Sequence, residues 1–345
     1  MYCPCPTKDI GLSASSPKLL NASFSEQQLA QAQPELQNFW QQGQHQFFSS
    51  FDQTRIWYSS FRHPSPRAEI VLSPGRIEAA QKYQEFSFDL YQAGFTVHLI
   101  DHRGQGLSDR INADRHLGDV ADFQHYVKDF ALWLEQQIRP LQQAPLLGLA
   151  HSMGCAILCR YLQQHTEHGF SGAVYCSPMF GIQSQPVPKW IALALVRLLH
   201  KLNKLTGGKS RYFPGQKPYQ DKAFAGNHLT HSPVRYQLFR QLYQDVPHLQ
   251  LGGVSCRWLY QSLQAIEALH KAPALSLPQL LLQATEDPVV DNQMQQLYLK
   301  KHQQQALPCE LIAIPGALHE IIFESDPLRH QLFSALDRFV LQLGL

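Results

Sequence analysis

The chain has 345 residues, 44% of them hydrophobic, which is enough for one large domain with an insertion or for two ordinary domains. Its formal net charge of +2 argues against a nucleic-acid-binding protein, and no apolar stretch is long enough to cross a membrane. The seven cysteines are odd in number and several lie in apolar runs, as is typical of reduced thiols in a cytosolic protein.

Residues 1–44 are predicted to be an N-terminal extension. Residues 1–20 lack the apolar core of a signal peptide, and residues 1–23 are expected to be flexible. Cys3 and Cys5 have no partner cluster of the kind that a metal site needs, so we expect no metal there. Residues 24–43 show helix-like spacing of apolar side chains, although Pro34 interrupts the pattern.

From residue 45 onward, short apolar strands alternate with amphipathic helices, first over 45–180 and again over 261–345. This alternation predicts an α/β fold with a mostly parallel sheet and helices on both faces. Residues 45–61 are expected to form a hairpin around Asp52. The further predicted strands are 68–72, 96–100, 146–150, 172–176, 279–283 and 310–314, and the predicted helices are 78–93, 121–138, 155–163, 291–302 and 327–343. Residues 181–260 lack the alternation and are predicted to be a cap inserted over the sheet.

The segment 147–155 places Ser152 on the turn between a predicted strand and a predicted helix. Such a turn needs very small residues two positions before and after the serine, and Ala150 and Gly154 meet that need. The arrangement resembles the nucleophile turn of the α/β-hydrolases, so we expect Ser152 to be a nucleophile. An ordinary serine in a strand-to-helix turn is the alternative.

A serine hydroxyl needs a base to remove its proton, and His319 is the candidate for that base. It follows the last predicted strand and a Pro-Gly turn, where hydrolases of this fold present their histidine. His102 and His151 are the alternatives among the 17 histidines.

The acidic member of a catalytic triad is expected between Ser152 and His319, at the end of a strand. Asp287 follows the predicted strand 279–283, and the proline after it disfavours helical geometry. Asp291 and Glu286 are the alternatives.

An oxyanion formed during acyl transfer needs two backbone N–H donors. We expect one from Met153, directly after the nucleophile, and the other from Arg76, in the loop after the first central strand. A plain turn over residues 73–76 is the alternative interpretation of that loop.

Taken together, these motifs resemble the monoacylglycerol-lipase-like branch of the α/β-hydrolases, and within it the lysophospholipases of bacterial inner membranes. The resemblance covers about residues 45–342 and lies mainly in the segments 74–78, 100–108, 150–154, 177–181 and 316–320. Two positions depart from the family pattern: Arg76 stands where many members have a small residue, and Ala150 replaces a glycine. The motif 101–104 is expected to brace the loops below the site, with a direct catalytic role for Arg103 as the alternative.

Residues 168–220 contain no Asp or Glu but seven cations, Lys189, Arg197, Lys201, Lys204, Lys209, Arg211 and Lys217. The cations flank an apolar run that begins at Trp190, a combination typical of a helix at an anionic membrane surface. Trp190, Lys201 and Lys204 are therefore the candidate cap residues for substrate or membrane contact. The alternative is a cap helix packed on the core with a solvated basic edge.

The resemblance implies hydrolysis of lysophospholipids to a fatty acid and a glycerophospho-alcohol through an acyl-serine intermediate, with acyl transfer to another lipid as a variant. It implies no metal or organic cofactor, and a cytoplasmic enzyme peripheral to the inner membrane. A monoacylglycerol lipase or general carboxylesterase is the alternative enzyme. A non-catalytic lipid-binding protein is the alternative of another class, and intact Ser152, Asp287 and His319 argue against it.

Overall fold

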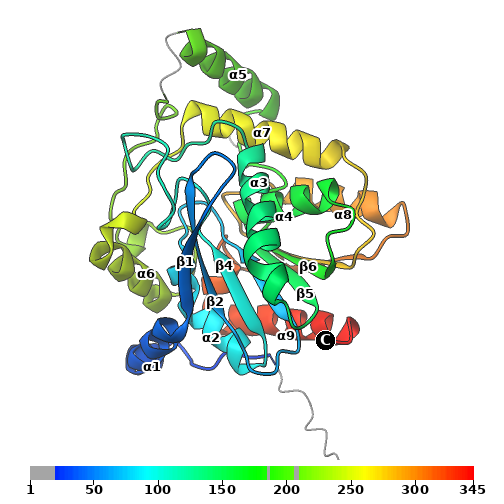
Figure 1. The fold of residues 1–345 in the computed structure, drawn as a ribbon. Helices are drawn as coiled ribbons and strands as arrows, with labels where there is room; N and C mark the ends of the chain where they lie inside the picture. Colours follow the sequence, from blue (N-terminus) through cyan, green and yellow to red (C-terminus); the bar gives the residue numbers. More distant parts are fainter. Residues whose placement is uncertain (1–19, 185–186, 206–209) are drawn as a thin grey trace, which may run out of the picture.

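The computed structural model describes residues 20–184, 187–205 and 210–345, and its centre is an eight-stranded sheet (Figure 1). The strand order is β1-β2-β4-β3-β5-β6-β7-β8. The strands are β1 (Gln44–Ser49), β2 (Arg55–Phe61), β3 (Glu69–Ser73), β4 (Thr96–Ile100), β5 (Leu146–His151), β6 (Phe170–Cys176), β7 (Gln279–Ala284) and β8 (Cys309–Ile314).

Burial explains where each strand lies in the sheet. Every residue of the central strands β3 and β5 is buried, whereas most of the edge strand β1 is not. The predicted hairpin forms an antiparallel β1–β2 pair, β2 adds antiparallel to β4, and the strands from β4 to β8 are all parallel. The predicted mostly parallel sheet is therefore confirmed.

Helices cover both faces of this sheet, as expected (Figure 1). One face is packed by α1 (Leu29–Gln42), α2 (Gln84–Gln92) and α9 (Asp326–Gln342). The other is packed by α3 (Gln124–Trp133), α4 (Met153–Gln164) and α8 (Asn292–Gln303). Pro34 is accommodated inside α1, and the helix predicted from residue 78 begins as a 3₁₀ turn at Ala80 before α2.

The expectation of a flexible segment over residues 1–23 is wrong for residues 20–23, and residues 1–19, with Cys3 and Cys5, lie outside the described residues. Leu20 is buried in the apolar cluster to which α9 contributes, and its backbone N–H donates to Asp337 of α9 at 3.0 Å. The N–H of Ser23 donates to Asp89 at 2.7 Å. These contacts fix the segment against the core because they bury apolar surface and satisfy its backbone donors.

The segment predicted to be a cap contains α5 (Lys189–Leu205), α6 (Pro233–Asp245) and the start of α7 (Cys256–Lys271). The predicted boundary at residue 260/261 falls inside α7, whose 16 residues run without interruption from the cap onto α4. In Figure 1, α5 is the outermost helix and lies beyond α7. None of the helices in the described ranges is long and apolar enough to span a membrane.

Candidate active site

Ser152 lies at a strained position between β5 and α4, with φ 52° and ψ −116°. A non-glycine residue with positive φ costs free energy, and such residues cluster at functional sites. The turn is tight because α4 passes close to the loop after β3: a Cβ added at Gly154 would lie 2.0 Å from the carbonyl oxygen of Ser73. Gly154 is therefore required, whereas the fully buried Ala150 shows that the family's other glycine is not.

A continuous chain of hydrogen bonds joins the three predicted triad members. The Nε2 atom of His319 lies 2.9 Å from the Oγ atom of Ser152, and Nδ1 lies 2.7 Å from the Oδ2 atom of Asp287. A carboxylate can only accept, so the proton of the neutral imidazole resides on Nδ1 and Nε2 is free to accept from the serine hydroxyl. The other oxygen of Asp287 accepts from the backbone N–H groups of Val289 and Val290, which hold the carboxylate in place.

The alternative residues are engaged elsewhere. Asp291 caps the N-terminus of α8 by accepting from the Gln293 N–H at 3.0 Å, and Glu286 is exposed. The Nε2 atom of His102 lies 3.0 Å from the hydroxyl of Ser73 rather than near Ser152.

Both ring nitrogens of His151 are bonded to groups other than Ser152. Its Nδ1 atom lies 3.0 Å from a carboxylate oxygen of Glu78, and its Nε2 atom lies 3.1 Å from the backbone carbonyl oxygen of His319. Both partners are acceptors, so both ring nitrogens carry protons and the imidazole is cationic. Burial alone would lower the pKa of His151, but the Glu78 carboxylate reverses that effect and raises it.

Glu78 connects this imidazole to the loop after β3. The same Glu78 oxygen accepts from the Gly75 N–H and from the Tyr83 hydroxyl, each at 2.5 Å, and the other oxygen pairs with Lys82. Lys82 also pairs with Glu320, the residue after His319, at 2.6 Å. The sequence did not predict this buried cluster. Glu78 and His151 lie in the segments 74–78 and 150–154 that carry the family resemblance, but no local pattern in either segment links the two residues.

The two predicted oxyanion donors flank Ser152. Met153 is the first residue of α4, so the helix itself supplies no acceptor for its N–H. Arg76 follows Gly75, at which an added Cβ would lie 3.0 Å from the Cβ atom of Ser152. The loop is held from the cap as well, because the Tyr243 hydroxyl of α6 donates to the Ile77 carbonyl at 2.6 Å. Ile77 has a φ of 65°, which a β-branched residue adopts only when its surroundings impose it.

This geometry can be set beside known proteins. Residues 64–326 match the family described as "Serine aminopeptidase, S33", which is more than half of the chain. The chain belongs to this family. This S33-family hydrolase is 37% identical to "Lysophospholipase L2" of Escherichia coli (strain K12) over 309 residues, which cover 88% of this chain and 89% of the relative. It is 31% identical to "Probable lysophospholipase L2" of Haemophilus influenzae over 89% of this chain and 95% of the relative.

More distant relatives and solved structures match as well. "Monoglyceride lipase" of Rattus norvegicus is 26% identical over 83% of this chain and 85% of the relative. The solved structure of a soluble variant of monoglyceride lipase from Saccharomyces cerevisiae superposes with a TM-score of 0.64 at 19% identity, covering 87% of this chain and 96% of that one. A carboxyl esterase from Bacillus coagulans gives a TM-score of 0.65 at 19% identity, covering 88% and 99%. These solved structures confirm the α/β-hydrolase fold.

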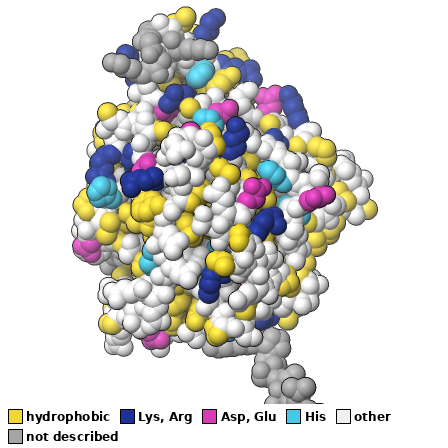
Figure 2. All heavy atoms as spheres, viewed as in Figure 1, with side chains coloured by type: hydrophobic (Ala, Val, Ile, Leu, Met, Phe, Trp, Pro, Cys, Tyr) yellow, Lys and Arg dark blue, Asp and Glu magenta, His cyan; other side chains and the backbone are white. Residues whose placement is uncertain are grey.

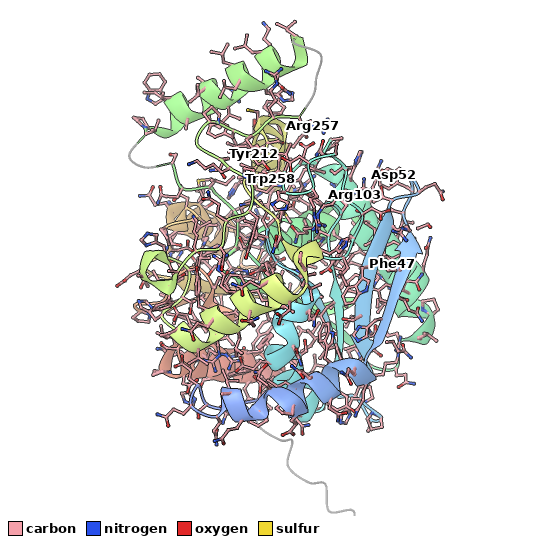
Figure 3. The ribbon with its side chains drawn as sticks, turned by 90° about the vertical axis from the view of Figure 1, so that its left-hand side faces the viewer. Phe47, Asp52, Arg103, Tyr212, Arg257 and Trp258 are labelled. Atoms are coloured by element: carbon pink, nitrogen blue, oxygen red, sulfur yellow. The ribbon has the colours of Figure 1, made fainter. Side chains whose placement is uncertain are left out.

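In this S33-family hydrolase, Arg103 is held by carboxylates rather than directed at the triad. It pairs with Asp129 at 2.6 Å and with Asp52, in the β1–β2 turn, at 2.8 Å (Figure 3). Asp101 accepts from the N–H groups of Ala80 and Leu107. The contacts of the 101–104 motif are those of a brace between loops.

The predicted cap residues lie away from the triad of the S33-family hydrolase, on the outermost helix. Trp190 is 73% exposed, Lys201 is exposed, and the side chain of Lys204 lies outside the described part of the chain. A polar cavity of about 390 Å³ does reach the site at Asp287, between the segment entering the cap and the loop before α8. Its lining residues include Gln183, Ser184, Thr285 and Asp291.

Proposed function

We propose that this S33-family hydrolase cleaves the carboxylic ester of lysophospholipids, releasing a fatty acid and a glycerophospho-alcohol. The observation that carries the proposal is the hydrogen-bonded chain of Ser152, His319 and Asp287 in a protein 37% identical to a lysophospholipase over most of both lengths. Ester hydrolysis needs no further group, since the chain supplies a nucleophile, a base and its orienting carboxylate.

The proposed mechanism follows from the atoms in place. His319 Nε2 takes the proton of the Ser152 hydroxyl while Oγ attacks the ester carbonyl, and Asp287 stabilises the imidazolium that forms. The backbone N–H groups of Met153 and Arg76 stabilise the oxyanion, each contributing about 3 kcal/mol. His319 then gives its proton to the departing glycerophospho-alcohol, and a water molecule hydrolyses the acyl-serine by the reverse sequence. A second lipid alcohol in place of that water gives acyl transfer.

Monoacylglycerol hydrolysis is the second candidate, because the chemistry of the ester is the same and relatives named "Monoglyceride lipase" match over 83% of this chain. The carboxylesterase alternative differs only in the leaving alcohol. A lipid-binding protein without activity is disfavoured, because binding alone gives no reason for a strained Ser152 in hydrogen-bond contact with His319.

The proposal includes an anionic membrane surface as the source of substrate, on the cytoplasmic side of the inner membrane. The outward face of α5 exposes Trp190, Ile191, Leu195 and Leu198, with Arg197 and Lys201 exposed between them. At the upper end of the molecule in Figure 2, hydrophobic and basic side chains lie side by side. An apolar face with interspersed cations supports docking at the boundary between head groups and acyl chains.

The test uses Ser152→Ala and His319→Ala, alone and combined, with 1-palmitoyl lysophosphatidylethanolamine as substrate. Each single variant is expected to lose more than a thousandfold in kcat, and the double variant to be scarcely worse, because the residues act as one unit. A fluorophosphonate probe should label the wild type but not Ser152→Ala. If the kcat losses of the two single variants multiply in the double variant, or if Ser152→Ala is still labelled, other residues carry out the chemistry.

A further inference from the structure

The Arg76 side chain extends from the loop beside Ser152 into the junction between core and cap. Its Nη1 atom donates to the Gly252 carbonyl oxygen at 2.8 Å, and its guanidinium lies 5.5 Å from the ring centre of Trp258. Gly118 borders it on the core side, where an added Cβ would lie 3.2 Å from Nη1. Trp258 is labelled in Figure 3, below α5. Every one of these neighbours is electrically neutral.

Arg76 therefore lacks the carboxylate partners that three arginines in the core have. Arg103, Arg235 and Arg329 are buried, and each is paired with at least two carboxylates. Within the described residues, no carboxylate pairs with Arg76, and burial lowers the pKa of its guanidinium to about 10. Arg76 is half-buried, and its guanidinium, held only by neutral groups, is available to pair with an anion that arrives from outside the chain.

The position of Arg76 limits what that anion is attached to. Its backbone N–H is a proposed donor to the oxyanion, so the side chain starts beside the reacting ester. The guanidinium then lies at the end of a flexible side chain whose reach is comparable to the glycerol unit that separates ester from phosphate in a lysophospholipid. A guanidinium also offers a planar pair of N–H donors that matches two phosphate oxygens.

We propose that the guanidinium of Arg76 binds the phosphate of the lysophospholipid and so selects phosphate-bearing substrates over uncharged monoacylglycerols. This inference rests on the proposed function and adds to it the group that recognises the substrate. Cap anchoring alone would make the same contacts with Gly252 and Trp258, but it would affect charged and uncharged substrates equally.

The first experiment compares 1-palmitoyl lysophosphatidylethanolamine with 1-palmitoylglycerol in neutral detergent micelles. Arg76→Gln is expected to lower the ratio of the two kcat/KM values, phosphate-bearing over uncharged, by about 10- to 100-fold, because a charge-assisted bond is lost for one substrate only. Arg76→Lys keeps the charge without the planar donors and should fall between Gln and the wild type. A ratio that stays at the wild-type value in Arg76→Gln would overturn the inference.

Arg257 offers a matched control in the same junction, because it is paired with Asp119 and lies beside Trp258 (Figure 3). Arg257→Gln disturbs the cap there without removing the unpaired cation, so the substrate ratio should stay within twofold. A fall equal to that of Arg76→Gln would show that the ratio reports cap disorder. If the wild type hydrolyses neither substrate, the proposed function fails and not merely this inference.

The second experiment uses sn-glycerol 3-phosphate as a probe with 1-palmitoylglycerol as substrate. It should inhibit the wild type competitively, and the inhibition constant should rise at least tenfold in Arg76→Gln. Fluorophosphonate labelling of Ser152 reports whether each variant is folded. Labelling is done on separate samples, because the labelled enzyme is inactive. Equal inhibition constants for the wild type and for an Arg76→Gln variant that labels normally would contradict phosphate binding by Arg76.

Discussion

Asp287 and Asp291 both follow β7, yet their side chains have separate roles. Asp287 contacts the imidazole of His319, while Asp291 caps α8. A loop of a few residues can present two carboxylates in different directions, so sequence order alone left both open. The hydrogen-bond geometry favours Asp287 as the residue that orients the base.

Asp287→Asn should leave the fold intact but lower kcat by up to about ten-thousandfold, because an amide can stabilise the wrong imidazole tautomer. Asp291→Asn should have a small effect, since asparagine is also a good helix cap. Steady-state turnover of a soluble ester, with circular dichroism as the folding control, measures both. The opposite ranking would make Asp291 the acid of the triad.

The cationic His151 predicts a pH-dependent contribution to stability. Its pKa is raised in the folded state, so the folded protein holds a proton that the unfolded chain loses near pH 6.5. The stabilisation by His151 is therefore complete below pH 6.5 and is lost as pH rises through the folded-state pKa. The difference in unfolding free energy between wild type and His151→Gln should shrink above pH 6.5 in urea titrations at several pH values. A difference that grows with pH would mean that the imidazole is neutral.

The sequence predicted the site residues whose pattern lies within one contiguous segment, and it did not predict contacts between residues far apart in the chain. Ser152 was predicted correctly as a strand-to-helix turn, because the strand, the small residues and the helix are contiguous. The Glu78–His151 contact joins residues 73 positions apart, and nothing near either residue indicates it. The same holds for the reach of Arg76 to Gly252, which only the folded cap brings near.

At the scale of elements, the parallel strands and the amphipathic α5 were predictable from their apolar runs, whereas α6 and α7 were not. The start of α6 did carry a signal, since Ser232 caps the helix and a proline follows at its first position. The start of α7 is capped in the same way by Ser255, whose side chain accepts from the Trp258 N–H. The loops between these helices are polar and rich in glycine. When residues 181–260 are taken as one segment, these loops interrupt the helical spacing of the apolar residues.

The helix α5 is the element expected to contact the membrane. Arg197→Gln with Lys201→Gln should weaken binding to anionic vesicles by roughly 1 kcal/mol per charge, and added salt should have the same effect on the wild type. Leu195→Ser with Leu198→Ser should weaken binding to neutral vesicles too, because apolar contact is lost. Co-sedimentation measures binding, and turnover of a soluble short-chain ester is the control that should not change. If both variants sediment with vesicles as the wild type does, this face of α5 is exposed to solvent and does not contact the membrane.

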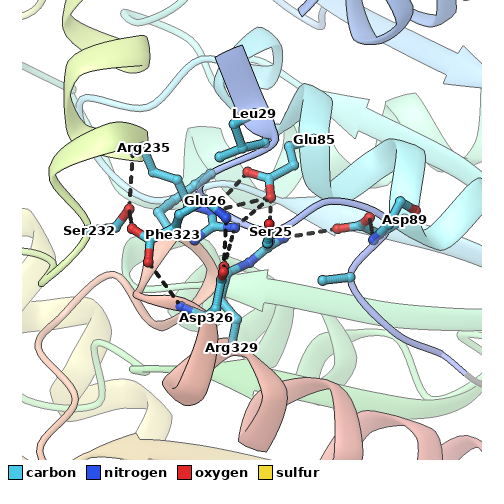
Figure 4. Close-up of polar contacts among 12 residues, drawn as sticks. Ser25, Glu26, Leu29, Glu85, Asp89, Ser232, Arg235, Phe323, Asp326 and Arg329 are labelled. Atoms are coloured by element: carbon cyan, nitrogen blue, oxygen red, sulfur yellow. Dashed lines mark hydrogen bonds and ion pairs between the residues drawn. The ribbon is translucent and has the colours of Figure 1, made fainter. Parts of the chain in front are cut away.

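At the scale of the whole molecule, one buried network joins three regions of the chain (Figure 4). Arg235 of α6 pairs with Glu85 of α2 and with Asp326 of α9, each at 2.9 Å. Glu85 also pairs with Arg329 of α9, and Glu26 accepts from the hydroxyl of Ser232. The N-terminal segment, the core and the cap are thus linked through charges that are costly to leave unpaired.

Glu85→Gln should lower the free energy of unfolding by about 3 kcal/mol, because the buried guanidinium groups of Arg235 and Arg329 each lose one carboxylate partner. The exposed pair of Glu310 and Arg338 offers a control, and Glu310→Gln should leave the urea midpoint nearly unchanged. Unfolding followed by tryptophan fluorescence measures both. Equal midpoints for the two variants would show that the network adds nothing to stability.

The positions of Leu20 and of the C-terminus relative to α5 also determine how the molecule can be attached to a solid support. Both the first described residue and the C-terminus lie at the α9 end of the molecule, and α5 lies at the opposite end (Figure 1). Enzyme immobilised on beads or on a sensor chip through a C-terminal tag would point α5 into the flowing solution. Attachment through an engineered cysteine on α5 would instead turn that helix toward the support, so the two orientations would separate lipid capture from ester turnover on one instrument.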